Sequence, residues 1–214
     1  MSKCVALKND FPTAKVQKEI LASPTQKISI LAKNIGVNIF PTEDSNIKIE
    51  LRGNILADML SLTFEANEIL SKNDRILTIL AQADEKVIKK KLFINVFLPA
   101  NLIYELLISS DTFVCTDSNL RFYMLDISTN AHVSVYSSFA DAVIKTIRGD
   151  IYIHTLALSD VDITIETIKG NVTLNIDGIC GYHFKNNFIR SRCKYSDYEA
   201  DIYINSAKGT CKIK

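Results

Sequence analysis

Apolar and polar residues alternate along much of this chain, with the period of two that is typical of half-buried β-strands. From Lys27 onward the segments ISILAKN, VNIF and NIKIELR follow this pattern, separated by Gly36 and by the turn-forming run PTEDSN. The segment RILTILAQ predicts a further strand, and LFINVFLP predicts an apolar strand that ends at Pro99. Between Ile103 and Asp177 strand patterns follow one another with little helical signal, so the sequence predicts an all-β protein.

A ten-residue pattern, Ile-x-[Ser/Thr]-[Ile/Ala]-[Arg/Lys]-Gly-x-apolar-x-apolar, occurs three times in the second half of the chain. It reads IKTIRGDIYI at 144–153, IETIKGNVTL at 165–174 and INSAKGTCKI at 204–213, so the copies begin 21 and then 39 residues apart. Weaker copies begin at Ile127 and Ile108. A fixed period near 20 residues is the signature of stacked short strands. We therefore predict a solenoid with turns of about 20 residues.

The repeat also predicts how the chain is organised. Residues 1–25 are expected to form a lead-in or cap, with either a short helix or an extended segment at 14–22, and residues 26–214 to form the solenoid domain. Residues 54–70 carry helical spacing and also the strand pattern SLTFEA. Residues 178–198 interrupt the rhythm between the second and third strong copies, which predicts an irregular turn of the coil.

The core is expected to consist of the inward-facing apolar residues of the rungs, whose burial contributes about 25 cal/mol per Å². These residues are Ile144, Ile147, Ile151, Ile153, Ile163, Ile165, Ile168, Val172, Leu174, Ile204 and Ile213. The last turn, which ends at Lys214, has no later sequence to cover it, so we expect that this end could pair with another chain.

Composition narrows the possible functions. The chain has 214 residues, 47% of them hydrophobic, and a formal net charge of +1, which argues against a dominant nucleic-acid role. It contains no run of 18 apolar residues that would predict a membrane span. The N-terminus has no apolar signal segment, which favours a cytoplasmic location. The five cysteines form no CxxC, so we expect no zinc ribbon and predict buried reduced thiols, with Cys115 and Cys211 at strand positions.

A family resemblance adds to this interpretation. The segment LFINVFLPANLIYELLISSDTF, followed by TIRGDIYI and TIKGNVTLNI, resembles the bacterial putative-adhesin family of unknown function, in which a strand ending in Pro leads into repeated T-x-x-G-[DN]-hydrophobic rungs. ISILAKNIGVNIFPTEDSNIKIEL is similar to the start of that domain, so the resemblance covers residues 26–214. It implies a single-stranded right-handed β-solenoid (β-helix) and an exported or envelope-associated protein. The chain departs from the family by lacking a signal peptide and by carrying Asn-Ala or Asp where several glycines would stand.

Stacking the rungs in register predicts rows of outward side chains that could bind a ligand. One row would hold His132, Asp150, Asn171 and Thr210; a second Ser134, Tyr152, Thr173 and Lys212; and a third Tyr136, His154 and Asn175. Aromatic and polar side chains on a flat sheet can stack against and hydrogen-bond sugars, although the same rows are compatible with an ordinary solvated face. The candidate binding residues are His132, Tyr136, Asp150, Tyr152, His154, Asn171, Thr173 and Asn175.

Other chemistry has weaker support. Asp160 and Asp162 lie on one face of a strand, with Glu166 beyond, and paired carboxylates can serve hydrolysis or bind Ca²⁺. We expect no acidic neighbour in the next rung, because Gly181–Phe184 follows there in the sequence. The three histidines lack metal-ligand spacing, and no catalytic or cofactor motif is present, so no metal, cofactor or catalytic residue is predicted. The basic runs at 89–91 and 190–194 favour charged turns over nucleic-acid contacts.

The sequence thus favours a non-enzymatic binding or scaffold protein of the adhesin type, contacting cell-envelope glycans or proteins. The alternative is a polysaccharide lyase or hydrolase on the same β-helix. A cytoplasmic partner protein is a third hypothesis, and a surface or envelope location remains the alternative to the cytoplasm.

Overall fold

The structure is a computed structural model that describes residues 16–22, 26–53, 62–70, 75–83, 92–184, 187–190 and 197–213. Within these ranges it contains strands and no helix, in agreement with the prediction of an all-β protein. Accordingly, no helix of this part of the chain is long and apolar enough to cross a membrane.

The strands form two large sheets of mixed direction, here named sheet I and sheet II. In spatial order, sheet I contains β1 (Val16–Leu21), β4 (Asn46–Gly53), β7 (Leu92–Pro99), β3 (Gly36–Thr42), β9 (Val114–Thr116), β11 (Val133–Val135), β13 (Ile151–Leu156), β15 (Val172–Asp177) and β19 (Cys211–Ile213). Sheet II contains β17 (Asn187–Arg190), β16 (Gly181–Phe184), β18 (Glu199–Lys208), β14 (Val161–Lys169), β12 (Ser138–Arg148), β10 (Arg121–Thr129), β8 (Ile103–Ser110), β2 (Gln26–Lys33), β6 (Arg75–Ala83) and β5 (Leu62–Leu70).

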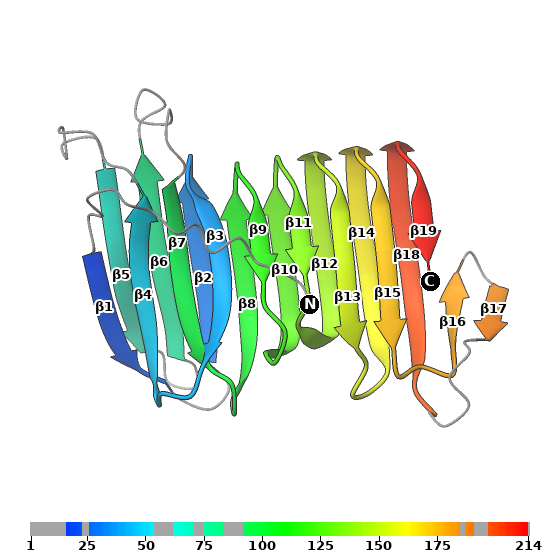
Figure 1. Ribbon diagram of the computed structural model, residues 1–214, viewed down its shortest axis with the longest axis horizontal. Coiled ribbons are helices and arrows are strands. Elements are labelled where there is room, and N and C mark those ends of the chain that lie inside the picture. The colour runs from blue at the N-terminus through cyan, green and yellow to red at the C-terminus, as the bar shows by residue number, and fades with distance from the viewer. Residues whose placement is uncertain are drawn as a thin grey trace.

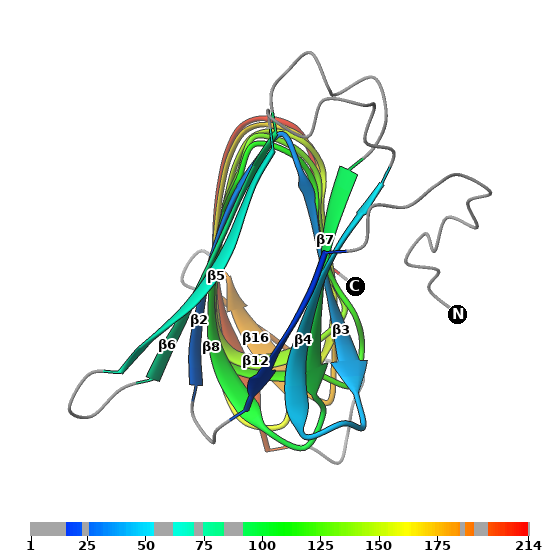
Figure 2. The same ribbon diagram turned by 90° about the vertical axis from the view of Figure 1, so that its left-hand side faces the viewer.

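The chain passes back and forth between the two sheets. Strands β8, β10, β12, β14 and β18 of sheet II are each followed by a strand of sheet I, and each pairs in parallel with its neighbour in the stack. Figure 1 shows the strands side by side from β1 and β5 at one end to β18 and β19 near the other. Viewed along the stack, the two sheets face each other (Figure 2). The inward side chains of both sheets therefore share one long core.

The strand register agrees with the alignment of the sequence repeats. Ile144 pairs with Ile165, and Ile165 pairs with Ile204. The weaker copies also fall in line, since Ile108 pairs with Ile127 and Ile127 with Ile144.

The glycines of the repeat stack on one another at the corner between the sheets. A Cβ built on Gly170 would lie 1.9 Å from the carbonyl oxygen of Gly149, and one built on Gly209 would lie 1.8 Å from that of Gly170. Successive backbones thus approach too closely for any side chain, which explains why the repeat has glycine at this position.

Most of the expected core is buried, but two of its members are not. Ile144, Ile151, Ile153, Ile163, Ile165, Val172 and Leu174 are at most 2% exposed, while Ile204 and Ile213 are half-buried against the core. The prediction was wrong for Ile147 and Ile168, which are 47% and 57% exposed. The alternation of inward and outward side chains continues to the end of each strand. The residue before each of these two isoleucines therefore points inward, and in both strands it is a threonine.

These inward threonines form a buried polar row. Thr146 and Thr167 are each 4% exposed and pair in register, and the hydroxyl of Thr146 donates to that of Thr167 over 2.9 Å. In the preceding rung, the hydroxyl of Thr129 donates to the backbone oxygen of Thr112. Since hydroxyls can satisfy one another from rung to rung, the Ser/Thr position of the repeat is explained by the core rather than by solvent.

The regions that were uncertain in sequence are now partly defined. Leu62–Ala66 of the strand pattern SLTFEA lie in β5, whereas residues 54–61, which include its first residue and the helical spacing, lie outside the described residues. Within the predicted lead-in, β1 forms an edge of sheet I, antiparallel to β4. In the irregular 178–198 segment, β16 and β17 form an antiparallel pair beyond β18, visible at the far end of Figure 1. Cys115 is buried as expected, but Cys211 is exposed, because it lies in the last strand of sheet I.

Candidate functional site on the outer faces of the sheets

The predicted rows lie together on the outer face of sheet I, over β11, β13 and β15. Ser134 pairs with Tyr152, Tyr152 with Thr173, and Thr173 with Lys212. His154 pairs with Asn175 in the same way. The residues on either side of Tyr152 are buried, whereas Tyr152 itself is only half-buried, so this side chain points outward as predicted.

The first row is tied to the backbone of the stack. The backbone N–H of Asp150 donates to Nδ1 of His132 over 2.9 Å, and that of Asn171 donates to Oδ1 of Asp150 over 2.8 Å. The backbone N–H of Thr210 in turn donates to Oδ1 of Asn171 over 3.1 Å. Each side chain thus accepts a hydrogen bond from the next rung, which satisfies backbone donors at the corner. This row is therefore well suited to aligning the rungs, and its side chains are less available to a ligand.

The aromatic part of this face is free of such a ladder. The rings of Tyr136 and Tyr152 lie with their centroids 5.5 Å apart, tilted by 48°. Nε2 of His154 lies 3.0 Å from a carboxylate oxygen of Asp177 at the end of β15. Together with Thr173 and Asn175, these side chains offer ring faces beside hydroxyl and amide groups. We name Tyr136, Tyr152, His154, Thr173 and Asn175 the aromatic face.

A row of carboxylates crosses the outer face of sheet II. Asp141 pairs with Asp162, and Asp162 pairs with Asp201. The expectation that Asp162 lacks an acidic neighbour in the next rung was wrong, because β18, and not the strand at Gly181–Phe184, lies next to β14. Directly paired residues of neighbouring strands lie about 4.8 Å apart, so the three carboxylates repel one another.

The electrostatics of this row centre on Asp162. Desolvation, followed by the charges of Asp201, Asp141 and Asp160, raises the pKa of its carboxyl above the ordinary value. A hollow of about 670 Å³ lies beside it, between β14, β18 and β16. Within the described part of the chain, no group of three or more His, Cys, Asp or Glu side chains is arranged to hold a metal ion.

The other acidic residues singled out in sequence have structural partners. Oδ1 of Asp160 accepts a hydrogen bond from the backbone N–H of Glu199 over 3.0 Å, and Glu166 forms an ion pair with Lys145 at 3.3 Å. Nε2 of His183 lies 3.0 Å from a carboxylate oxygen of Glu199. These contacts link neighbouring elements of the stack and hold Asp160 and Glu166 in place.

A second hollow, of about 740 Å³, runs across six strands of sheet II, and sequence reasoning missed it. Its outward residues include Leu31 at one end, Ser109 and Ser128 in the middle, and Ile147 and Ile168 near the corner. The sequence signal was present but was interpreted differently, since the isoleucines of the repeat were assigned to the core. A hollow that crosses the strands has the shape to accept an extended chain.

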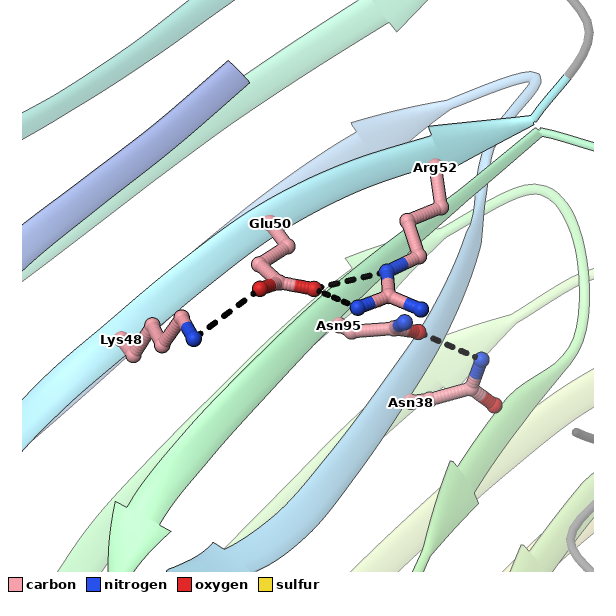
Figure 3. A network of polar contacts seen from close by, with 5 residues as sticks. All are labelled: Asn38, Lys48, Glu50, Arg52 and Asn95. Carbon is pink, nitrogen blue, oxygen red and sulfur yellow. Dashed lines mark hydrogen bonds and ion pairs between the residues drawn. The ribbon is translucent and has the colours of Figure 1, made fainter. Parts of the chain in front are cut away.

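An ion network around a buried carboxylate on sheet I was also missed. The side chain of Glu50 in β4 is 1% exposed and lies 2.5 Å from a guanidinium nitrogen of Arg52 and 3.2 Å from Nζ of Lys48 (Figure 3). Burial acts to raise its pKa, but the hydrogen bonds and charges of Arg52 and Lys48 outweigh this effect and hold the pKa below its ordinary value. Beside it, the amide of Asn38 donates to that of Asn95 over 3.0 Å. The mutual pairing of these groups indicates a structural role.

Both basic runs considered in sequence fall largely outside what can be described. Residues 89–91 and 191–194 lie outside the described residues. Their predicted role as charged turns stays a prediction.

The architecture defined here, two facing sheets of mostly parallel strands in register, can be compared with known proteins. No protein-family model matches the chain, and no curated protein matches it in sequence. Among solved structures, it is similar to a putative cell adhesion protein from Clostridium sporogenes, with a TM-score of 0.61 and 17% identity over 94% of this chain and 99% of that one. A putative adhesin from Bacteroides fragilis aligns over 94% of this chain and 97% of its own, with 13% identity and a TM-score of 0.45. The first of these likenesses shows that the fold is shared with a solved bacterial protein.

Proposed function

We propose that this chain is a non-enzymatic binding protein of the adhesin type, built as a single-stranded right-handed β-solenoid, and that its aromatic face contacts cell-envelope glycans. The observation that carries the proposal is the outward Tyr136–Tyr152 pair beside His154, Thr173 and Asn175. Aromatic rings stack on the apolar faces of sugars, and hydroxyl and amide groups bond to sugar hydroxyls. The cell-adhesion description of the Clostridium sporogenes protein supports a binding role.

The experiment is an array of bacterial and host surface glycans, followed by calorimetric titration of the glycan that is retained most strongly. We expect Tyr152→Ala to weaken binding at least about tenfold, which corresponds to about 1.4 kcal/mol. Tyr123→Ala is the matched control, because Tyr123 is a 68% exposed tyrosine on sheet II. Retention of no glycan, or equal effects of the two substitutions, would refute the proposed face.

The alternative, a polysaccharide lyase or hydrolase, is favoured by one observation, the raised pKa of Asp162 among neighbouring carboxylates. It predicts turnover of uronate polymers that Asp162→Asn abolishes. Structural partners for Asp160 and Glu166 weigh against it, because acid–base cleavage needs a second free carboxyl at a working distance.

A further inference from the structure

The end of the stack at β18 is only half covered. Strand β16 pairs with Glu199–Ile202, the first part of β18. On that same side, none of the described residues pairs with Tyr203–Lys208, the remaining six residues of the strand. We name Tyr203–Lys208 the notch, because the strand position next to β18 is occupied by β16 only as far as Ile202.

Burial of the inward side chains falls where this cover ends. Ala200 and Ile202 are 0% and 6% exposed, whereas Ile204 is only half-buried. The equivalent of Ile204 in the preceding rung, Ile165, is 0% exposed. The core is therefore sealed in every rung up to β14 and opens at the notch.

A buried hydroxyl also points to a missing neighbour. The hydroxyl oxygen of Ser206 is buried and has no hydrogen-bond partner, although the preceding members of its row, Thr146 and Thr167, bond to each other. An open parallel edge with an exposed core is a template for another strand.

We propose that the notch binds the notch of a second copy of this chain, with the two β18 strands antiparallel about a two-fold axis. The shape favours this occupant. A six-residue segment of β18 from the second copy can lie next to the notch, in line with β16 and directly after its end. In this arrangement β16 of the second copy lies in line with β18 of the first copy, beyond Lys208. It meets no obstacle from the described residues there, because the first chain has already turned toward β19. The contact is the same on both copies, so the pair closes and leaves no further notch.

The pairing also specifies which side chains meet. Antiparallel strands must place outward residues opposite outward residues, so Asn205 lies opposite either its own copy or Ala207 of the second copy. The inward Ile204 and Ser206 then come under the cover that the preceding rungs have. When Asn205 lies opposite Ala207, Ser206 lies opposite Ser206 of the second copy, which gives its buried oxygen a hydroxyl partner.

The test is the mass of the full chain in solution, measured by analytical ultracentrifugation up to about 0.1 mM, where an interaction of micromolar Kd is saturated. The proposal expects a dimer. Asn205→Lys places two like charges near the axis and is expected to raise the dimer Kd at least about tenfold. Ser128→Lys is the matched control, since Ser128 occupies the same outward row on β10, which is paired on both sides.

Circular dichroism checks that each variant is folded, and Ala207→Lys replaces Asn205→Lys if the latter is not. A dimer that is weakened by the notch variant and not by the control supports the proposal. A monomer over the whole range would overturn it, as would a dimer that Asn205→Lys leaves intact. Open-ended oligomers would also overturn it, because they require head-to-tail contacts with the end that carries β1 and β5.

Discussion

Two isoleucines of one repeat provide a direct test of how the rungs are built. Ile165 and Ile168 stand three residues apart in β14, and the sequence pattern alone assigns both to the core. In the structure Ile165 is 0% exposed, at the centre of a row that runs from Ile144 to Ile204, while Ile168 is 57% exposed on the outer face. Truncating each to alanine removes the same atoms from two different environments.

The magnitudes follow from burial. Ile165→Ala leaves a cavity between two neighbouring rungs and is expected to lower the free energy of unfolding by about 2–5 kcal/mol. Ile168→Ala removes atoms that are mostly in water already, so the expected loss is below about 1 kcal/mol. The difference between the two variants is therefore at least about 1 kcal/mol, within reach of a chemical denaturation experiment.

The assay is urea unfolding followed by circular dichroism, with both variants and the wild type measured side by side. Unchanged slopes would show that the unfolded states are comparable. Equal losses for the two variants, or a larger loss for Ile168→Ala, would show that the alternation of β14 is assigned to the wrong faces.

Three further substitutions test the polar groups. Asp162→Asn should raise stability at pH 7 by a few tenths of a kcal/mol, since it removes repulsion at a solvent-exposed site. Because the pKa of Asp162 is raised in the folded state, its carboxyl takes up a proton as the pH falls, and protonation relieves the repulsion. The stability gained by Asp162→Asn, measured by urea unfolding, should therefore vanish by about pH 3. Arg52→Ala should cost about 1–3 kcal/mol at pH 7, because the buried carboxylate of Glu50 loses its contact with the guanidinium. The cost should be smaller at acid pH, where Glu50 is protonated, and an unchanged melting curve would contradict this. Tyr104→Phe should cost about 0.5–1.5 kcal/mol, because the buried hydroxyl, whose pKa is raised by desolvation, donates to the carbonyl of Pro99; a neutral or stabilising result would show that this bond contributes nothing.

The sequence was most informative where the repeat is strict. Gly149, Gly170 and Gly209 mark corners whose backbones nearly touch, and this steric requirement leaves a residue-level signal that survives in every strong copy. The alternation after each glycine predicted correctly that Ile151 and Ile153 are buried and that Tyr152 between them is not. Both signals can be recognised within one rung, because the alternation follows from strand geometry and the close approach of the next rung leaves a glycine at a fixed position.

The isoleucines before the glycines were misassigned because the contact that decides their orientation lies between rungs. Hydrophobicity placed Ile147 and Ile168 in the core, yet both are exposed, and the neighbouring Thr146 and Thr167 are buried instead. Threonine is tolerated inside because its neighbour in the next rung is also a threonine, which supplies the hydrogen bond that a buried hydroxyl needs. A single rung does not contain that partner, so the pattern within one rung could not predict the outcome.

The carboxylate row shows the same limit more clearly. Asp201 follows Asp162 by 39 positions in the sequence, and the intervening segment contains strands of its own, so sequence order suggested that Gly181–Phe184 would be the neighbour of β14. In the sequence β16 and β17 come before β18, but in the sheet β18 lies between β16 and β14. This placement brings Asp201 next to Asp162, where its charge adds to the desolvation that raises the pKa of Asp162, and it leaves β16 covering only the first part of β18. One departure from sequential stacking thus produces both the acidic row and the notch, and any candidate site in this molecule has to be sought across rungs rather than along the chain.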